Sequence, residues 1–368
     1  MSSLFLLLIS IMALSYADEK PTNAVVDLNS LMDMSSLVEK VADKQVVFVG
    51  ESHDQYQHHL NQLAIIQGLH TLHPNLAIGL EFFFQPFQQV LDRYIAGEIE
   101  EHDLIRETEY FDRWRFDYRL YRPIFRFARE QGIPLIALNL ESEITQQVGK
   151  AGIESLSEAD KARLPKEIDR GVDAYRERIR AVYDQHPHMQ GRDFENFLDV
   201  QLLWDEGMAE RAAEWLQQHP DNHMVILAGV GHLAYREGIP ARMMRRTPVS
   251  HAVILNANRA DGLDSSLGDY LIVTDKVELP PAGKLGVFLD LGNSPPSISG
   301  FDKESGAAKA GVESGDRLLA IDGEPISTYT DIRIALMDKA VGDKVQIEVE
   351  RERLLRGTFR EIFSVTLN

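Results

Sequence analysis

Residues 46–53 read Val-Val-Phe-Val-Gly-Glu-Ser-His, an apolar run that ends in a turn with polar side chains. Three further runs end in a similar way: residues 76–81 (Leu-Ala-Ile-Gly-Leu-Glu), 134–141 (Pro-Leu-Ile-Ala-Leu-Asn-Leu-Glu) and 224–232 (Met-Val-Ile-Leu-Ala-Gly-Val-Gly-His). Continuous apolar runs of this length, separated by helical segments, are typical of parallel strands that are buried on both faces. The sequence therefore predicts an α/β fold in which a mostly parallel sheet is flanked by helices.

The polar residues that follow these runs are candidates for a functional site. In parallel sheets ligands bind beyond the carboxyl ends of the strands, so we expect Glu51, His53, Glu81 and His232 to gather at one edge. Carboxylate and neutral imidazole groups together suit zinc, manganese or iron. Without a metal, a carboxylate beside a histidine fixes its tautomer and makes it a general base. An incidental histidine near a helix start explains Glu51 and His53 alone, but less readily all four residues.

The composition of the chain excludes several classes of function. The chain has 368 residues, 44% of them apolar, which is enough for two domains with real cores. Its formal net charge of −19 argues against nucleic acid or an anionic membrane surface as the main partner. Cysteine is absent, so disulfides, thiolate metal sites, a cysteine nucleophile and an acylated-cysteine lipid anchor are excluded.

The first residues have the pattern of a secretory signal. Residues 4–14 are apolar but too short to span a bilayer as a helix. Small residues at Ser15 and Ala17 fit the positions that a signal peptidase recognises, and a polar chain begins at Asp18. We therefore predict a signal peptide over residues 1–17 and a mature protein that is periplasmic or secreted.

The pattern of strands and helices divides the rest of the chain. Residues 23–257 alternate as expected of the α/β domain, and the polar residues 258–267 form a candidate linker. The helices that we expect in the first domain cover residues 54–72, 86–96, 123–131, 157–183 and 193–218. We expect His58 and His59 on the solvent face of the first of these helices. In the last of these helices, Asp205 interrupts an apolar stripe. A buried carboxylate needs a partner, which would be either a histidine of the sheet edge or an arginine of residues 115–126.

From residue 268 to residue 368 the chain changes to short strands, turns and one helix near 329–338. The loop Lys-Leu-Gly-Val at 284–287 and the run Gly-Asp-Arg-Leu-Leu-Ala-Ile-Asp-Gly at 315–323 resemble a bacterial PDZ domain, a small β-rich fold. The resemblance implies that Leu285, Gly286 and Val287 bind the carboxylate of a peptide C-terminus, while the peptide adds as a strand to the sheet edge. A PDZ domain that only packs against its neighbour is the alternative.

Residues 114–122, Trp-Arg-Phe-Asp-Tyr-Arg-Leu-Tyr-Arg, combine aromatic and cationic side chains. At helical spacing one face would carry the aromatic residues and a neighbouring face the arginines, the candidates being Tyr118, Tyr121, Arg115, Arg119 and Arg122. This combination suits haem, because rings pack on its faces, arginines pair with its propionates and tyrosinate ligates ferric iron. Pro123 interrupts the helical phase. An aromatic core face beside solvated arginines is the alternative.

Taken together, the motifs at residues 50–53, 79–83, 117–123, 201–209 and 229–232 resemble the ChaN-like family of haem-binding uptake proteins. This family belongs to a superfamily that includes the Tiki and TraB proteins and, more distantly, erythromycin esterases. The resemblance implies an α/β fold, haem bound through a tyrosine and pairing of subunits as a homodimer around haem. The wider superfamily implies metal-dependent peptidase or hydrolase chemistry, which by position falls on Glu51, His53, Glu81 and His232. Membrane anchoring as a lipoprotein does not transfer, because the chain lacks cysteine.

The sequence therefore leaves three candidate functions. The first is an exported haem-binding protein of haem or iron uptake whose PDZ module recruits a partner. The second is a metal-dependent hydrolase of peptides or esters that uses the four strand-end residues, with Glu51 as general base. The third is an adaptor without chemistry of its own.

Overall fold

The computed structural model describes residues 26–185, 193–260, 263–353 and 357–368, and these form two compact units. The first unit comprises the described residues up to Ile99 together with Leu120–Glu278, and the second comprises Glu100–Arg119 and Leu279–Asn368. The predicted signal peptide lies outside the described residues. Within the described parts of the chain, no helix has both the length and the apolar character that a membrane span requires.

A six-stranded parallel sheet forms the centre of the first unit and confirms the predicted fold class. Its strand order is β3-β2-β4-β1-β5-β6, with β1 (Val46–Glu51), β2 (Leu76–Phe84), β3 (Leu135–Asn139), β4 (His223–Gly229), β5 (His251–Ala257) and β6 (Tyr270–Val273). All residues of β1, β2 and β3 are buried. Their continuous apolar sequences arise because helices cover both faces of the sheet.

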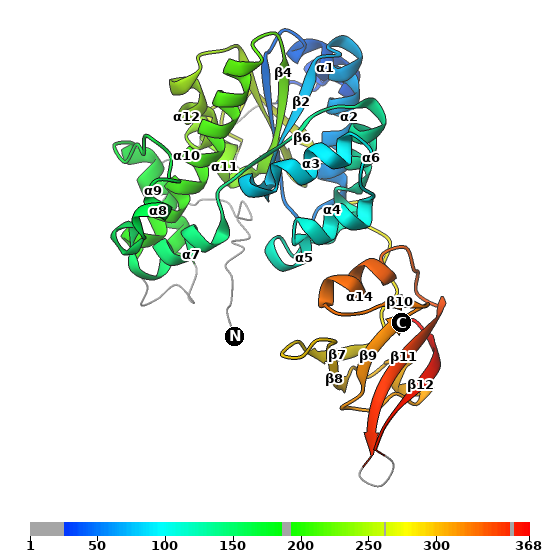
Figure 1. The fold of residues 1–368 in the computed structure, drawn as a ribbon. Coiled ribbons are helices and arrows are strands. Elements are labelled where there is room, and N and C mark those ends of the chain that lie inside the picture. The colour runs from blue at the N-terminus through cyan, green and yellow to red at the C-terminus, as the bar shows by residue number, and fades with distance from the viewer. Residues whose placement is uncertain (1–25, 186–192, 261–262, 354–356) are drawn as a thin grey trace. The chain divides into compact units, whose positions relative to one another are not determined.

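The helices of the first unit lie on the two faces of this sheet, as Figure 1 shows. One face is covered by α10 (Phe194–Gln218), α11 (Val230–Leu233) and α12 (Ile239–Arg246), whose apolar side chains share a core with β1, β4 and β5. The other α-helices of the first unit are α1 (Met34–Val41), α2 (Tyr56–Leu72), α3 (Gln88–Ile95), α6 (Arg122–Gln131), α7 (Ser142–Ala151), α8 (Glu158–Lys161) and α9 (Asp173–Asp184). In Figure 1, α1, α2 and α6 lie on the face opposite α10.

Two of the predicted helices are interrupted. The expected helix over residues 157–183 is split into α8 and α9, because Pro165 and Gly171 lie between them and both disfavour a continuous helix. The aromatic segment 114–122 is not one helical face either. Arg115 adopts a left-handed backbone (φ 70°), and only a short 3-10 turn at Tyr118–Leu120 precedes α6.

The first sheet extends beyond the expected domain. Strand β6 pairs in parallel with β5, through Ile254 with Tyr270 and Ala257 with Val273. Its residues lie in the range that the sequence assigns to the C-terminal domain, so the compact first unit continues to Glu278. The short strand was missed because it has four residues and is only partly buried.

The second unit contains a five-stranded antiparallel sheet in the order β12-β11-β9-β8-β7. Its elements are β7 (Val287–Asp290), β8 (Ser297–Phe301), α13 (Gly306–Ala310), β9 (Arg317–Ile321), β10 (Glu324–Pro325), α14 (Tyr329–Leu336), β11 (Lys344–Arg353) and β12 (Gly357–Thr366). Strand β10 pairs with β9 and lies outside this order. The predicted helix near 329–338 corresponds to α14, and β7 lies at the edge of the sheet.

The second unit also includes a segment from the middle of the first sequence domain. This segment carries α4 (Glu101–Glu107) and α5 (Tyr110–Arg113), and both contact α14. Arg106 forms an ion pair with Asp331 (2.9 Å), and the Arg333 guanidinium lies 4.3 Å from the centre of the Phe111 ring. Residues 100–119 therefore form part of the structure that supports the PDZ helix.

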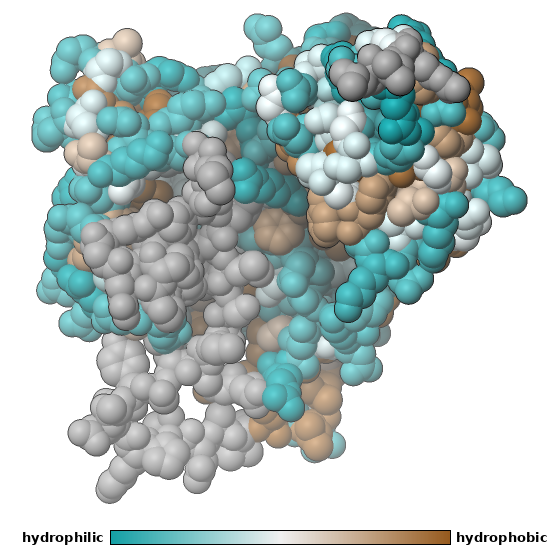
Figure 2. Space-filling model, turned by 90° about the horizontal axis from the view of Figure 1, so that it is seen from below, coloured by the Kyte–Doolittle hydropathy of each residue, from teal (hydrophilic) through white to brown (hydrophobic). Residues whose placement is uncertain are grey.

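The surface of the chain reflects its acidic composition. Asp and Glu number 57 against 38 Lys and Arg. On the face drawn in Figure 2, the described surface is mostly hydrophilic, with smaller apolar patches.

Candidate functional site

The carboxyl ends of three adjacent strands bring the predicted residues to one edge of the sheet. Strand β1 ends at Glu51, β2 carries Glu81 near its end, and β4 ends at Gly229, just before the helix α11 that carries His232. Glu51 and Gly229 are direct partners in the pairing of β1 with β4. Because the strands are parallel, their ends meet at the same edge.

Glu51 and His53 form the first acid–histidine pair. Nδ1 of His53 lies 2.6 Å from Oε1 of Glu51, and Nε2 of His59 lies 3.4 Å from the other carboxylate oxygen. The Tyr121 hydroxyl donates to Oε1 of Glu51 at 3.3 Å. Burial alone would lower the pKa of His53, but the Glu51 carboxylate outweighs it and raises that pKa above the ordinary 6.5. Glu51 thus orients His53 and favours its protonated form.

His232 forms the second pair, with a carboxylate at each ring nitrogen. Its Nδ1 lies 2.6 Å from Oδ1 of Asp205, and its Nε2 lies 3.3 Å from Oε1 of Glu81. The Tyr175 hydroxyl donates to the other oxygen of Asp205 at 2.7 Å, and the Gly229 N–H donates to Oε2 of Glu81 at 2.6 Å. All four carboxylate oxygens therefore have partners that fix the imidazole between them.

These hydrogen bonds and charges shift the pKa values of both His232 and Glu81. Burial alone would lower the pKa of His232, but Glu81 and Asp205 outweigh it and raise the pKa to about 10. Burial alone would raise the pKa of Glu81, but His232 and His53 lower it to about 2. At neutral pH the group is an imidazolium between two carboxylates, which acts as a proton donor or stabilises developing negative charge.

Gly229 allows the two pairs to approach each other. A Cβ atom at this position would lie 2.9 Å from Cε1 of His53 and 3.6 Å from Oε2 of Glu81. The first of these distances is too short for a real contact, so a side chain here would push His53 away. The absence of a side chain on Gly229 therefore permits the close packing of the first pair against the second.

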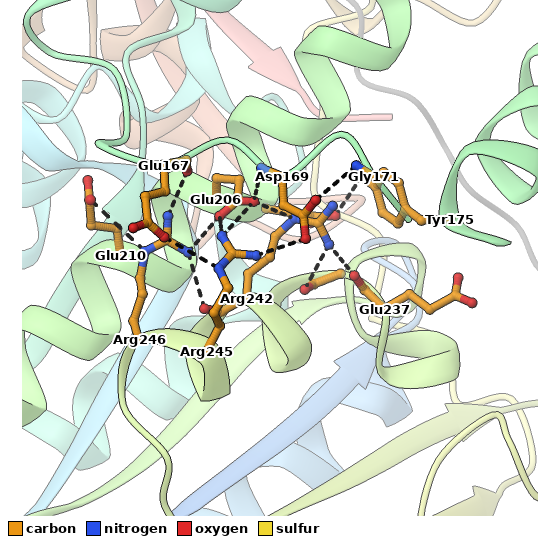
Figure 3. Close-up of polar contacts among 12 residues, drawn as sticks. Glu167, Asp169, Gly171, Tyr175, Glu206, Glu210, Glu237, Arg242, Arg245 and Arg246 are labelled. Carbon is orange, nitrogen blue, oxygen red and sulfur yellow. Dashed lines mark hydrogen bonds and ion pairs between the residues drawn. The ribbon is translucent and has the colours of Figure 1, made fainter. Parts of the chain in front are cut away.

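A buried ionic cluster fixes helix α10 behind the site. Glu206 is completely buried next to Asp205 in the sequence, and Figure 3 shows Arg242, Arg245 and Arg246 gathered around its carboxylate. The closest contacts to Glu206 from Arg245 and Arg246 measure 2.8 and 2.6 Å, and Arg242 lies 3.2 Å away. Such a cluster ties α10 to α12, which sets the position from which Asp205 meets His232.

The second unit holds a separate candidate binding site at the start of β7. Gly286 adopts a left-handed backbone (φ 73°), and a Cβ there would lie 2.6 Å from Cα of Ser305. Leu285 and Gly286 use their carbonyl groups to accept hydrogen bonds from Ala307 and Asp302. Within the described residues, the N–H groups of Leu285 and Gly286 donate no hydrogen bond. Two unpaired N–H groups beside an edge strand suit a carboxylate.

Two stretches of the chain match known protein families. Residues 37–243 match the family described as haem-binding uptake, Tiki superfamily, ChaN, and residues 283–357 match the PDZ domain family. The first match covers more than half of the chain. The chain belongs to the ChaN-like family. Its first unit is hereafter the ChaN-like domain and its β-rich part the PDZ domain.

Individual proteins resemble this chain either at low sequence identity or over a short stretch. The structure of ChaN of Campylobacter jejuni, described with cofacial haem binding, is 15% identical with a TM-score of 0.53, and the match covers 65% of this chain and 91% of that one. A candidate zinc metalloprotease of Brucella suis is 42% identical over 57 residues, 16% of this chain and 15% of that protein. RETICULATA-RELATED 5 of Arabidopsis thaliana, chloroplastic, is 22% identical over 240 residues, 61% of this chain and 32% of that protein. The chain thus spans less than a third of the length of these two curated relatives, and the ChaN structure supports the fold alone.

The strand-end residues of the ChaN-like domain come together as hydrogen-bonded pairs. Across the described residues, no group of three or more His, Asp or Glu side chains is arranged to hold a metal ion. The expected ligands Glu51, His53, Glu81 and His232 lie at one edge, but both ring nitrogens of His232 face carboxylates. The arrangement in the structure is therefore one of acid–base pairs.

The predicted haem residues do not fit a haem group as they are arranged here. The side chains of Tyr118 and Tyr121 have an exposed fraction of 0%, and the Tyr121 hydroxyl already donates to Glu51. Arg119 is engaged by the Asp117 carboxylate at 2.8 Å and by the carbonyl of Pro280 at 3.0 Å. The phenol oxygens of Tyr118 and Tyr121 are therefore not accessible to a haem iron in this arrangement.

The two remaining arginines of the haem prediction lie in different local structures. Arg115 is exposed and sits at the left-handed turn, whereas Arg122 is half-buried at the start of α6. The single helical face on which the prediction depended is absent, because the turn at Arg115 and the helix start at Arg122 break the phase.

Several site residues were mispredicted or missed. His58 and His59 were expected to be solvated, but both are 1% exposed, because His58 Nδ1 accepts from the Ser52 N–H and His59 faces Glu51. Of the two partners expected for Asp205, the structure has the edge histidine. Tyr175 gave no signal in the sequence.

Proposed function

We propose that this chain is an exported protein, periplasmic or secreted, that binds haem through its ChaN-like domain and peptide C-termini through its PDZ domain. Membership of residues 37–243 in a family described as haem-binding uptake supports the haem part of the proposal. A role in haem or iron uptake follows from the same membership. Pairing of two subunits around haem is the arrangement that the family resemblance implies.

Haem titration with variants of the two tyrosines tests this function. The full mature chain should shift the Soret band of added haemin at a defined stoichiometry. Tyr118→Phe and Tyr121→Phe should keep that shift, because both phenols are closed to a ligand in the structure. Loss of the ferric charge-transfer bands in one variant alone would instead mean that this phenol becomes accessible and ligates the iron. No Soret shift in the wild type would refute haem binding.

The peptide part of the proposal is carried by the loop before β7. Its two unpaired N–H groups and the left-handed Gly286 form a cradle for a carboxylate, and β7 has a free edge for an added strand. We expect apolar C-terminal peptides to bind the full chain with micromolar affinity, roughly −8 kcal/mol. An amidated peptide of the same sequence is the control, and equal affinity of the two would refute carboxylate capture.

Hydrolysis of peptides or esters is the second candidate function, and the two acid–histidine pairs favour it. Glu51, the expected general base, would accept a proton from the attacking water, and His53 beside it would stabilise developing negative charge. The His232 imidazolium would donate a proton to the leaving group. In the metal-dependent form of this proposal, Glu51, His53, Glu81 and His232 would rearrange around a divalent ion.

Assays of one protein preparation distinguish a hydrolase without metal, a metal-dependent hydrolase and a protein without hydrolase activity. Turnover of chromogenic ester and peptide substrates is measured beside the metal content of the protein, for the wild type, His53→Gln and His232→Gln. Activity that both variants lose supports the hydrolase. Stoichiometric zinc or manganese that is lost in Glu51→Ala supports its metal-dependent form, and absence of turnover and of metal in the wild type refutes this candidate.

A further inference from the structure

Two histidines stack on each other at the end of the parallel sheet opposite the candidate site. His73 follows helix α2 and His223 begins strand β4. Their ring centres lie 3.7 Å apart, with an angle of 19° between the ring planes, and both side chains are half-buried. Because they lie where the strands begin, neither belongs to the site at the carboxyl ends of the strands.

Each of the two rings donates a hydrogen bond to the connection between α1 and β1. Nε2 of His73 donates to the carbonyl of Ala42 at 2.7 Å, and Nδ1 of His223 donates to the carbonyl of Lys44 at 3.0 Å. A carbonyl oxygen only accepts, so the bonded nitrogens carry hydrogen, and Nδ1 of His73 and Nε2 of His223 are the atoms that can take up a further proton. The two rings therefore hold residues 42–45 while both are neutral.

This connection joins helix α1 to the sheet. Val41 at the end of α1 is completely buried, and Val38 packs so closely on α2 that a Cβ atom at Gly68 would lie 2.8 Å from its side chain. The Gln45 side chain donates to the carbonyl of Pro220 at 2.8 Å, which ties the connection to the turn before β4. Because α1 is the first α-helix of the described chain, it can leave α2 while the order of the sheet stays intact.

Stacking makes a second positive charge on this pair unfavourable. One imidazolium can lie on a neutral ring, but two would repel each other across the 3.7 Å that separates the ring centres. Burial lowers the pKa of His223 below the ordinary 6.5, the hydrogen bond to Lys44 opposes this, and the charge of His73 lowers the pKa further.

The other titratable side chains at this end of the sheet do not offset the repulsion. Asp43 and Lys44 pair with each other at 2.9 Å, and Asp221, two residues before His223, is exposed. Within the described residues, neither His73 nor His223 forms an ion pair with a carboxylate. The remaining histidines of this region have their rings against aromatic side chains: His70 on Phe127, His219 on Trp215 and His251 on Phe48.

We propose that His73 and His223 form a pH-sensitive switch, which holds α1 on α2 at neutral pH and releases it in mild acid, when both rings take up a proton. Release would uncover the apolar side chains that α1 buries, among them Val38 and Val41. Because the pKa of His223 is lower in the folded protein than its ordinary 6.5, its contribution to folding is complete above that pH and declines as the pH falls below it. The switch depends neither on haem binding nor on hydrolysis.

Hydrogen exchange of the full mature chain tests this switch. Exchange rates are measured at about pH 7.5 and about pH 5 and corrected for the intrinsic effect of pH. We expect the backbone N–H groups of residues 37–45 to lose protection about tenfold in acid, the factor that corresponds to one unit of pKa. The N–H groups of α10 serve as the internal reference and should keep their protection.

Two glutamine variants assign this effect to the histidine pair. In His73→Gln and in His223→Gln the new side chain can still donate to the backbone carbonyl but takes up no proton, so the loss of protection in acid should disappear. His219→Gln is the matched control. The His219 ring also stacks, at 4.2 Å, and its Nδ1 also donates to a carbonyl, at 2.8 Å, but it lies on the Trp215 indole instead of a second histidine. This variant should keep the tenfold loss.

An NMR titration of the ring signals separates charge repulsion from a purely structural role. In His73→Gln the midpoint of His223 should rise by up to about one pH unit, because the neighbouring charge is gone. This measurement decides the question even if a glutamine variant loosens α1 at neutral pH. An unchanged midpoint would overturn the proposal. So would an α1 that stays protected in acid in the wild type, or a loss of protection in acid that persists in both glutamine variants.

Discussion

Oδ1 of Asp205 lies 2.6 Å from Nδ1 of His232, and this contact joins the middle of helix α10 to the end of strand β4. Asp205 is 1% exposed, and its second oxygen accepts from Tyr175. A buried carboxylate with two such partners fixes both the tautomer and the orientation of the imidazole. The other ring nitrogen then faces Glu81 and the first acid–histidine pair.

Replacing Asp205 by asparagine should lower the pKa of His232. The amide cannot supply the negative charge that, with Glu81, raises this pKa to about 10. We expect a drop of about one to three pH units, the range for loss of a close opposite charge. An NMR titration of the His232 ring measures it. Asp199→Asn, the same change on α10 at a residue paired with Arg170, is the control and should leave the His232 pKa unchanged.

The contact between His232 and Glu81 also gives the stability of the fold a defined pH dependence. The pKa of His232 rises from 6.5 to about 10 on folding, so its contribution is complete below about pH 6.5 and is lost as the pH rises through 10. The pKa of Glu81 falls from 4.5 to about 2, so its contribution is complete above about pH 4.5 and is lost as the pH falls toward 2.

Urea unfolding as a function of pH measures these two limits. The contribution of the pair to the free energy of unfolding should be largest between about pH 4.5 and 6.5. His232→Gln should remove the alkaline decline and leave a weaker protein at pH 6. An alkaline decline of unchanged size in this variant would mean that other groups cause it.

Substitution of Gly229 by alanine should destabilise the ChaN-like domain. The new methyl group would lie 2.9 Å from the His53 ring, and forcing extra volume into a packed site costs about 1–3 kcal/mol. Gly149→Ala is the matched control, because its methyl group would meet Val200 at an ordinary 3.5 Å within helix α7. There, alanine should stabilise by up to about 1 kcal/mol. Equal effects of the two changes on urea unfolding would contradict the close packing at Gly229.

The sequence predicted the sheet and its functional edge because both depend on local patterns. Four apolar runs correspond to β1 to β4, and the rule that parallel strands end at one edge predicts that Glu51, Glu81 and His232 lie together. The loop at Gly286 was likewise predictable, since a left-handed backbone and a close neighbour both require glycine there.

The remainder of the site depends on contacts between distant residues. Tyr121 donates a hydrogen bond to Glu51, which lies 70 positions earlier in the sequence. Tyr175 donates to Asp205 from α9, and this helix was not expected to begin where it does, because Pro165 and Gly171 interrupt the predicted helix over residues 157–183. His59 is buried although α2 shows no apolar stripe around it. Amphipathic periodicity reports which apolar residues are buried, but it does not report buried polar pairs.

Replacing Glu206 by glutamine should destabilise the ChaN-like domain more than any other single charge removal on α10. Glu206 has an exposed fraction of 0% and compensates Arg242, Arg245 and Arg246, of which Arg242 is itself 1% exposed. Removing one partner of a buried ion pair leaves uncompensated charge and costs about 3–5 kcal/mol.

Glu210→Gln is the matched control for this prediction. Glu210 lies one turn further along α10, is more exposed, and its closest ion pair, with Arg246, is 4.0 Å long. Its loss should cost less than about 1 kcal/mol. Urea unfolding compares the two variants, and the His232 ring signals report whether α10 has moved. A shift of these signals in Glu206→Gln but not in Glu210→Gln is expected, because the ionic cluster fixes the helix that carries Asp205. Unchanged His232 signals and a small loss of stability in Glu206→Gln would show that the cluster does not position the site.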